Sequence, residues 1–307
     1  WPELATHYGQ ATNQHGTAYW VLLRVVVAFS AFTGALQAVA EGPERTSEAA
    51  LPPQVLANGV PGTLYVGDSN FGIYSVVQAA VHFGMHVLVR LTAPRAGKVA
   101  GRARHPGSDC SVAWSPSKKD QVHPEMKAGP LAGRLLHRVL ERPGFRPVEL
   151  YLFTTLRDTT RYSVEDLVKL YGLRWHVELN LRYVKSTLDM ELLHGKSVDI
   201  VRKELQAGLL AYNLIRGFMV QAARQANLSP LTLSFTSCWR RLWHVLSTWL
   251  ATGAFPPSPE ALAKLLTRLA KCRIPKRERW RSEPRAVRRR PAGYPNLRGS
   301  REEARQQ

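Results

Sequence analysis

The stretch that decides the fold is residues 171–185, which read YGLRWHVELNLRYVK. It contains no Pro, and its single Gly stands near the start. At 100° per residue, an apolar stripe lies beside a polar sector about 80° wide. The polar sector holds Tyr171, Arg174, Glu178, Arg182 and Lys185. This pattern predicts a helix at the rim of a core with its polar edge over a cleft. Glu178 four residues before Arg182 is also the spacing of an ordinary solvated pair.

The whole chain is strongly basic. It has 307 residues, 45% of them apolar, a net charge of +19 and a pI of about 10.3. The apolar content suffices for one large core or two smaller ones. The charge argues against an enzyme of small metabolites and favours a polyanionic partner, nucleic acid first and an anionic membrane second.

Cysteine usage and hydropathy favour a reducing, cytoplasmic location. Cys110, Cys238 and Cys272 are far apart and form no CxxC pair, so a zinc site or a disulfide framework is not expected. The most apolar stretch, residues 25–40, has 16 residues, which is short for a membrane span of about 20 residues. No signal-peptide pattern is present, and the first residue, Trp1, lies within folded-looking sequence, which suggests a fragment.

The order of elements predicts an α/β fold. A strand, a helix and another strand follow one another at residues 62–66, 75–83 and 85–91, as in a right-handed crossover of a partly parallel sheet. A strand hairpin is expected before them at residues 18–40, and a buried strand after them at 148–155.

The second half of the chain is mostly helical in pattern. Ser163 caps a helix that is expected to run to about residue 188. Further helices are expected at residues 200–226, 231–251 and 260–271. Residues 273–307 carry 12 Lys or Arg against 4 Glu, a net of +8 (12 − 4), and are expected to gain order on a polyanion.

Asp68 stands where a buried strand ends and a Gly-rich loop begins, which is where open sheets bind ligands. Alone it would be a turn or capping residue. Together with Glu178 it could hold hard divalent cations such as Mg²⁺, and two such ions could clamp the oxygens of a phosphodiester. Arg174, Arg182 and Lys185 would then hold the DNA backbone.

The spacing Tyr171-x2-Arg174-x3-Glu178-x6-Lys185 resembles the Y-R-E-K signature of insertion-sequence DDE transposases, the group called transposase family four. Other segments resemble that family in the same order along nearly the whole chain: residues 67–72, 153–158, 204–216 and 283–295. The resemblance implies an RNase H-like mixed sheet flanked by helices, with a β-rich insertion and a helical, basic C-terminal part. Its divisions would be an RNase H-like core at 1–93 and 148–255, an insertion at 94–147, and a short helix with a basic arm at 256–307.

The same resemblance implies an activity and a site. Such enzymes use three carboxylates and two Mg²⁺ (or Mn²⁺) ions to cut transposon ends and join them to target DNA. Asp68 would be the second Asp and Glu178 the Glu, while Tyr171, Arg174 and Lys185 would contact phosphates near the transposon end. The implied partners are terminal inverted repeats, target DNA and a second copy in a synaptic complex, in a bacterial cytoplasm at the nucleoid, with no membrane.

Two features of the family concern single residues, a Trp of the insertion and the first Asp. In some relatives a Trp of the insertion holds a flipped base, and Trp114 is the one Trp between residues 94 and 147. A packing Trp is the alternative. The family's first Asp precedes the hairpin, but residues 1–67 contain no Asp. We therefore expect a core without its first strand, two of three metal ligands, and little Mg²⁺-dependent cleavage.

Three other functions compete with a transposase. A basic remnant could bind DNA without chemistry, and another RNase H-like nuclease, such as a resolvase, could share the fold. A structural RNA-binding protein would explain the charge but not the spacing in residues 171–185.

Overall fold

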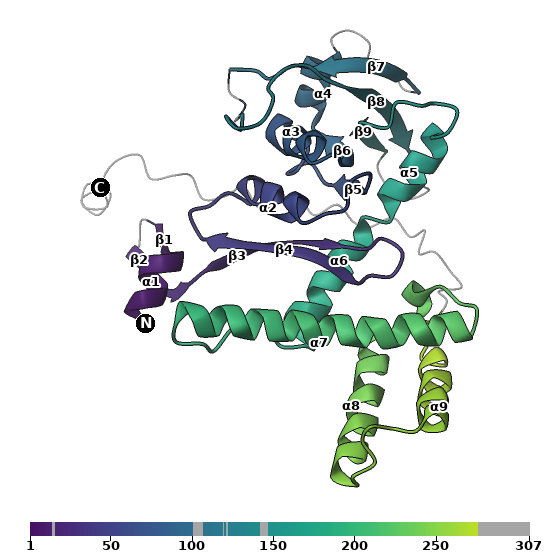
Figure 1. Cartoon of the computed structure of the whole chain (residues 1–307). Coiled ribbons are helices and arrows are strands. Elements are labelled where there is room, and N and C mark those ends of the chain that lie inside the picture. Colours follow the sequence, from purple (N-terminus) through teal and green to yellow (C-terminus); the bar gives the residue numbers. More distant parts are fainter. Residues whose placement is uncertain (14–15, 101–106, 119, 121, 142–146, 276–307) are drawn as a thin grey trace, which may run out of the picture.

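The computed structural model describes residues 1–13, 16–100, 107–118, 120, 122–141 and 147–275 (Figure 1). Its strands are β1 Gln10–Asn13, β2 Gly16–Val21, β3 Leu23–Phe29, β4 Leu36–Pro43, β5 Leu64–Gly67, β6 His86–Leu91, β7 Asp109–Trp114, β8 Leu131–Leu140 and β9 Val148–Thr154. Its α-helices are α1 Pro2–Tyr8, α2 Pro52–Ala57, α3 Tyr74–His82, α4 Ala93–Ala100, α5 Val164–Gly172, α6 Trp175–Arg182, α7 Val198–Gln225, α8 Phe235–Ala251 and α9 Pro259–Ala270. Short helical turns occur at η1 Glu48–Ala50, η2 Tyr183–Thr187 and η3 Pro230–Thr232. In this described part, no helix is long and apolar enough to cross a membrane.

A five-stranded mixed sheet forms the centre, in the order β5-β6-β9-β8-β7. β5 and β6 are parallel and the other pairs are antiparallel. Alternate side chains of β6 point to opposite faces. Val87 and Val89 pack in the same cluster as α3, whereas Leu88 packs with Leu167 of α5. The predicted mixed α/β fold with flanking helices is confirmed, and the sheet is buried on both sides.

The insertion contributes directly to this sheet. β7 and β8 pair with each other, and β8 also pairs with β9, from Arg134 opposite Thr154 to Leu140 opposite Val148. The range 94–147, for which the sequence predicted a β-rich insertion, therefore supplies two strands of the central sheet. Arg134 explains part of the register, because its buried guanidinium pairs with Asp109 at 2.6 Å.

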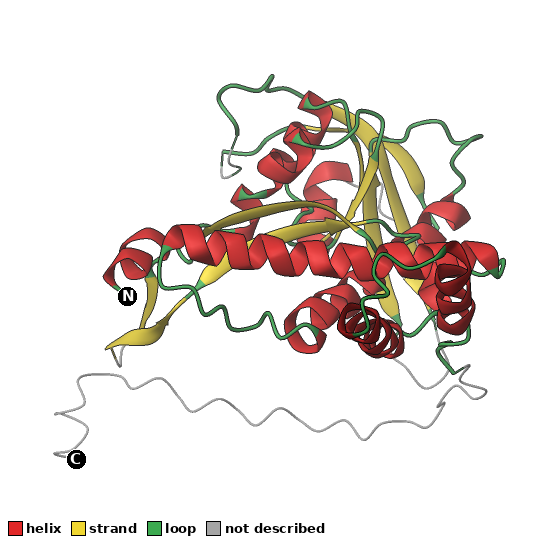
Figure 2. Cartoon of the chain, turned by 60° about the horizontal axis from the view of Figure 1, so that its bottom comes forward, coloured by secondary structure: helices red, strands yellow, loops and turns green. Residues whose placement is uncertain are grey.

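The N-terminal hairpin lies apart from the central sheet (Figure 1). β3 and β4 pair in a two-stranded sheet of their own, with Val26 opposite Ala40. The strand expected from residue 18 is interrupted at Leu22, so that β2 instead pairs with β1. One face of the hairpin packs on α2 and the other packs on α7, and both views show the hairpin running along α7 (Figure 2).

The helix expected at residues 163–188 is divided into three parts. α5 ends at Gly172, α6 begins at Trp175, and the π-helical turn η2 follows it. The chain tightens between α5 and α6, where Arg174 N–H donates to the carbonyl of Tyr171 and Val177 N–H donates to that of Arg174. The expectation of one regular helix is wrong, because local three-residue hydrogen bonds replace the four-residue ladder there.

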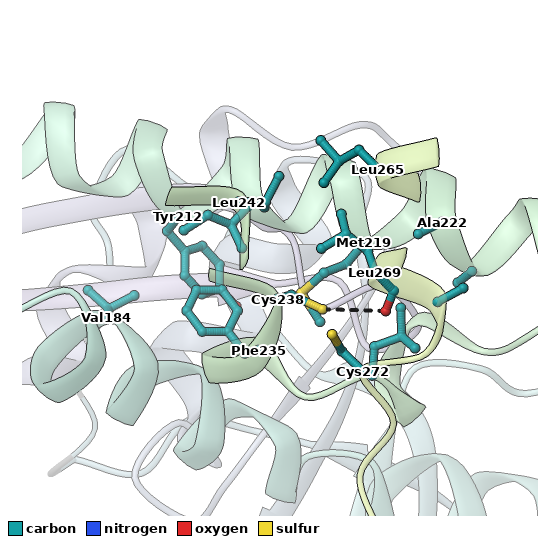
Figure 3. Close-up of a cluster of buried hydrophobic side chains, with 14 of the residues drawn as sticks. Val184, Tyr212, Met219, Ala222, Phe235, Cys238, Leu242, Leu265, Leu269 and Cys272 are labelled. Carbon is teal, nitrogen blue, oxygen red and sulfur yellow. Dashed lines mark hydrogen bonds between the residues drawn. The ribbon is translucent and has the colours of Figure 1, made fainter. Parts of the chain in front are cut away.

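The C-terminal helices pack around a separate apolar core (Figure 3). α7 is capped by Ser197, whose Oγ accepts from Ile200 N–H. Cys238 and Cys272 are free thiols buried in this core, and Cys238 Sγ donates to the carbonyl of Leu269 at 3.9 Å. Of the basic residues 273–307, those from 276 onward lie outside the described residues.

Candidate DNA-processing site

The loop after β5 holds Asp68 in a fixed turn. Asp68 Oδ1 accepts a hydrogen bond from Asn70 N–H at 2.9 Å, and the Asp68 carbonyl accepts from Gly72 N–H at 3.0 Å. A Cβ at Gly72 would lie 2.0 Å from the carbonyl oxygen of Arg90, so only Gly lets the loop approach β6 this closely. The carboxylate therefore projects from a loop that is anchored to the central sheet.

The α5–α6 junction carries the other carboxylate. Arg174 Nη2 donates to Glu178 Oε1 at 3.0 Å, with the two side chains 23% and 45% exposed. The Arg174 guanidinium also lies 6.0 Å from the centre of the Tyr171 ring. The junction thus gathers a phenol, a cation and a carboxylate on one side of the chain.

Tyr171 connects this junction to the Asp68 loop. Burial raises the pKa of the Tyr171 phenol, and the charge of Asp68 raises it further. Arg174 and Arg90 act in the opposite direction and lower that pKa. The phenol therefore lies within the electrostatic reach of both Asp68 and Arg174. Asp68 and Arg174 thus both act on Tyr171, and Arg174 in turn pairs with Glu178.

The remaining two predicted cations have no acidic partner among the described residues, although the Arg182 guanidinium lies 6.0 Å from the centre of the Tyr183 ring. Arg182 and Lys185 are exposed, and neither makes an ion pair with any other described residue. Lys185 lies in η2, and π-helical turns often occur at functional sites. Both cations are therefore available to an anionic partner beside Glu178.

Two neighbours of the site were missed from the sequence. Trp175 precedes Glu178 by three residues and is 58% exposed, a spacing that the sequence already contained. Arg90 lies on β6 and acts on the Tyr171 phenol through its charge. No local pattern marks Arg90, because the sheet brings it to the site from a distant part of the chain.

A buried cation supports the helix that carries Glu178. Arg216 of α7 is 2% exposed, and among the described residues it forms no ion pair. Its Nη2 donates to Asn180 Oδ1 at 2.5 Å and its Nε donates to the Tyr212 hydroxyl at 2.9 Å. Its Cζ lies 5.6 Å from the Tyr183 ring centre and 5.0 Å from that of Phe235. These contacts join α6 and η2 to α7 and α8, and so fix the position of the helix that carries Glu178.

Trp114 does not contribute to the site. It is 3% exposed and packs edge-to-face on Phe153, with ring centres 5.1 Å apart, and on Tyr74. A ring enclosed in the core cannot stack on a nucleotide base. The expectation that Trp114 contacts DNA is therefore corrected, and the residue is a packing Trp at the end of β7.

The donor chemistry suits a hard cation, but the donors are few. Carboxylate oxygens such as those of Asp68 and Glu178 are the ligands that Mg²⁺ prefers. In the described part of the chain, however, no three His, Cys, Asp or Glu side chains gather as a metal-binding group. Glu41, an acid earlier in the chain, is held instead by Arg202 and by the Tyr8 hydroxyl. Among the described residues, Asp68 and Glu178 are therefore the carboxylates left as candidates for a metal ion.

A mixed sheet with an acid at a strand end, and a second acid on a following helix among cations, is the arrangement of an enzyme that processes phosphodiesters. Comparison with known proteins gives the same class. The model of the family described as "Transposase DDE domain" matches residues 3–214. The chain therefore belongs to the DDE-domain transposase family, whose members generally use divalent metal ions.

Two curated relatives are insertion-sequence transposases. Over 149 residues the chain is 34% identical to "Transposase InsG for insertion sequence element IS4" of Escherichia coli (strain K12), and this match covers 47% of the chain and 33% of that protein. Over 81 residues it is 37% identical to "Probable transposase for insertion sequence element IS5377" of Geobacillus stearothermophilus, covering 26% of the chain and 21% of that protein. The matches thus span a third or less of the relatives' lengths.

Proposed function

We propose that this chain acts in DNA transposition, as the part of a transposase that cuts insertion-sequence ends and joins them to target DNA. The observation that carries the proposal is the chain of interactions in which Asp68 acts on Tyr171 through its charge, Tyr171 lies beside Arg174, and Arg174 pairs with Glu178. Membership of the DDE-domain family supports the same reaction class.

Asp68 and Glu178 are proposed as the residues that hold divalent metal ions, Mg²⁺ or Mn²⁺. Such ions, when bound, would polarise the phosphodiester and activate the attacking oxygen. The ion pair with Arg174 orients the Glu178 carboxylate at the junction. A half-exposed pair at this spacing contributes only about 0.3–0.5 kcal/mol, so Glu178 can exchange this partner readily.

Tyr171, Arg174, Arg182 and Lys185 are proposed to contact DNA phosphates. Arg174 can form two parallel hydrogen bonds to a phosphate, whereas Lys185 acts as a point charge. The net charge of +19 adds a favourable field for DNA over the whole molecule. We further propose that two copies act together on paired transposon ends.

A second candidate function is DNA binding without cleavage. It is favoured by the absence, in the part of the chain that the structure describes, of a group of three metal-binding side chains. On this second function, residues 1–307 alone should bind DNA and form no cleavage products.

Labelled duplexes that carry or lack the insertion-sequence end would be incubated with residues 1–307 and Mg²⁺ or Mn²⁺. The proposal expects tight binding, end-dependent products, and loss of these products in Asp68→Asn and Glu178→Gln. Binding without any products would support the second function. Products that form equally on duplexes without the end would indicate a different nuclease.

A further inference from the structure

Two buried thiols that are far apart in the sequence meet in the core of the C-terminal helices. Cys238 stands in the first turn of α8 and is 0% exposed, and Cys272 comes shortly after the end of α9 and is 9% exposed. Their side chains point toward one another, and the two thiols are within hydrogen-bonding distance (Figure 3). The third cysteine of the chain, Cys110, lies in β7 of the five-stranded sheet. The fold therefore makes a thiol pair that the sequence did not indicate.

The last turn of α9 holds both sulfur atoms. Cys238 Sγ donates to the carbonyl of Leu269 at 3.9 Å, and Cys272 Sγ donates to the carbonyl of the preceding residue, Arg268, at 3.6 Å. The backbone is fixed as well, because Ser234 N–H, at the start of α8, donates to the Cys272 carbonyl at 2.7 Å. The two sulfur atoms therefore meet in positions that the fold sets, and a bond between them would join segments that are already in contact.

The thiol pair stands where a strongly basic stretch of the chain begins. Residues 273–307 carry 12 Lys or Arg against 4 Glu, a net of +8 (12 − 4). The first of them are fixed beside η3, since Arg273 pairs with Leu233 in a β-bridge and Ile274 N–H donates to the Thr232 carbonyl at 2.8 Å. A bond between the thiols would thus hold the start of the basic stretch against α8.

The two thiols differ in how readily they should react. The thiolate is the reactive form of cysteine. Burial, and to a smaller degree the neighbouring Cys272, raises the pKa of the Cys238 thiol to about 12. Cys238 is therefore protonated near neutral pH and closed to solvent, whereas Cys272 keeps some exposure. A small oxidant in solution should react first at Cys272, and Cys238 should then react with the sulfur beside it.

We propose that Cys238 and Cys272 are a redox-responsive pair, which a small disulfide such as glutathione disulfide converts to an intramolecular disulfide. In the first step the Cys272 thiolate attacks the small disulfide, bonds to one of its sulfur atoms and releases the other as a thiolate. In the second step Cys238, after giving its proton to water, attacks the Cys272 sulfur and releases the second small thiolate. Two protein thiols are oxidised, and one small disulfide is reduced to two thiols. In a reducing compartment the pair stays open, and this chemistry does not depend on the proposed action on DNA.

Peptide mapping by mass spectrometry tests the closure. Residues 1–307 would be kept at about pH 8.5 with glutathione disulfide, then unfolded, alkylated and digested. The expected product is a linked pair of peptides that contain Cys238 and Cys272, about 2 Da lighter than the two separate peptides together. Dithiothreitol should remove the link. Absence of the linked pair, or a link that includes Cys110, would overturn the proposal.

Single variants separate the two steps. Cys238→Ser should keep one glutathione on Cys272, because the thiol that completes the reaction is missing. Cys272→Ser should carry no glutathione on Cys238, because this side chain is 0% exposed. Cys238→Ala and Cys272→Ala serve the same purpose if a Ser variant does not fold. Cys110→Ser is the matched control and should form the linked pair as the unmodified chain does. Equal amounts of glutathione on the remaining thiol of both pair variants would contradict the assigned order.

Urea unfolding shows whether the disulfide fits the native positions. The closed ring would span residues 238–272, and such a ring restricts the unfolded chain. The oxidised chain should therefore unfold at a urea concentration about 0.5–1 M higher than the reduced chain. The same shift is expected in Cys110→Ser, and none is expected in Cys238→Ser. An oxidised chain that unfolds at the same or a lower urea concentration would show that the bond distorts the fold, which would contradict the placement of the two thiols.

Discussion

Removal of the charges of Arg182 and Lys185 should weaken DNA binding and make the affinity depend less steeply on salt concentration. Arg182 and Lys185 are exposed and, within the described chain, have no acidic partner that would compete with a phosphate. Each phosphate contact contributes about 0.9 to the slope of log affinity against log salt on duplex DNA. The double variant Arg182→Gln/Lys185→Gln should therefore lower that slope by about 1.8.

The same relation gives the expected loss of affinity. With a slope of about 0.9, each phosphate contact raises the DNA affinity about eightfold when the salt falls from 1 M to 0.1 M. Loss of two contacts should therefore lower the affinity about 60-fold at 0.1 M salt. Anisotropy titrations of a labelled duplex at several salt concentrations measure both quantities. Binding of the variant and of the unmodified chain should converge at high salt.

A matched double variant controls for the change in net charge. Lys169→Gln/Lys203→Gln removes two exposed lysines, but these already pair with Asp166 at 3.8 Å and Asp199 at 2.7 Å. It should lower the slope by much less than the site variant. Equal slopes for the two double variants would refute the placement of DNA over the α6–η2 edge.

Three further predictions concern stability, and each uses urea unfolding monitored by circular dichroism. Gly72→Ala places a Cβ 2.0 Å from the Arg90 carbonyl oxygen and should lower the free energy of unfolding by about 1–3 kcal/mol, whereas an unchanged value would show that the Asp68 loop is not anchored there. Ser197→Ala removes the acceptor for Ile200 N–H and should cost about 1 kcal/mol, with Ser197→Asp restoring most of it. Burial raises the pKa of Tyr212 to about 12. As the pH rises, the unfolded chain therefore loses the Tyr212 proton before the folded chain does. The free energy of unfolding should fall by about 2–3 kcal/mol between about pH 10 and 12. Tyr212→Phe should flatten this fall, and an unaltered pH profile would contradict the assignment.

Local sequence patterns predicted the order of the helices and strands, but they did not predict where one long helix is divided. The order of strands, the crossover through α3 and the capped helix at Ser163 follow from local patterns, and the structure confirms them. The break after Gly172 was not predicted, because a continuous apolar stripe also fits two helices that meet at a tight turn. Helical periodicity indicates which face of a helix is buried, but it does not indicate where the helical pitch changes.

Two of the missed features depend on contacts between distant segments. Trp114 belongs to the core because β7 extends the central sheet, a pairing that its Pro- and Gly-rich surroundings did not indicate. Arg216 ends the segment 204–216 that resembles the family, but the sequence did not show that it joins α6, η2 and α8 through ring and amide contacts.

Manganese binding, measured by the loss of the free Mn²⁺ signal in electron paramagnetic resonance, tests most directly whether Asp68 and Glu178 form one site. The account predicts one weak site that Asp68→Asn and Glu178→Gln each abolish, with no greater effect in the double variant, because residues that share a site do not act additively. Glu165→Gln, at the start of α5, should leave binding unchanged. Independent, additive effects of the two site variants, or binding that survives both, would contradict the claim that these carboxylates act together.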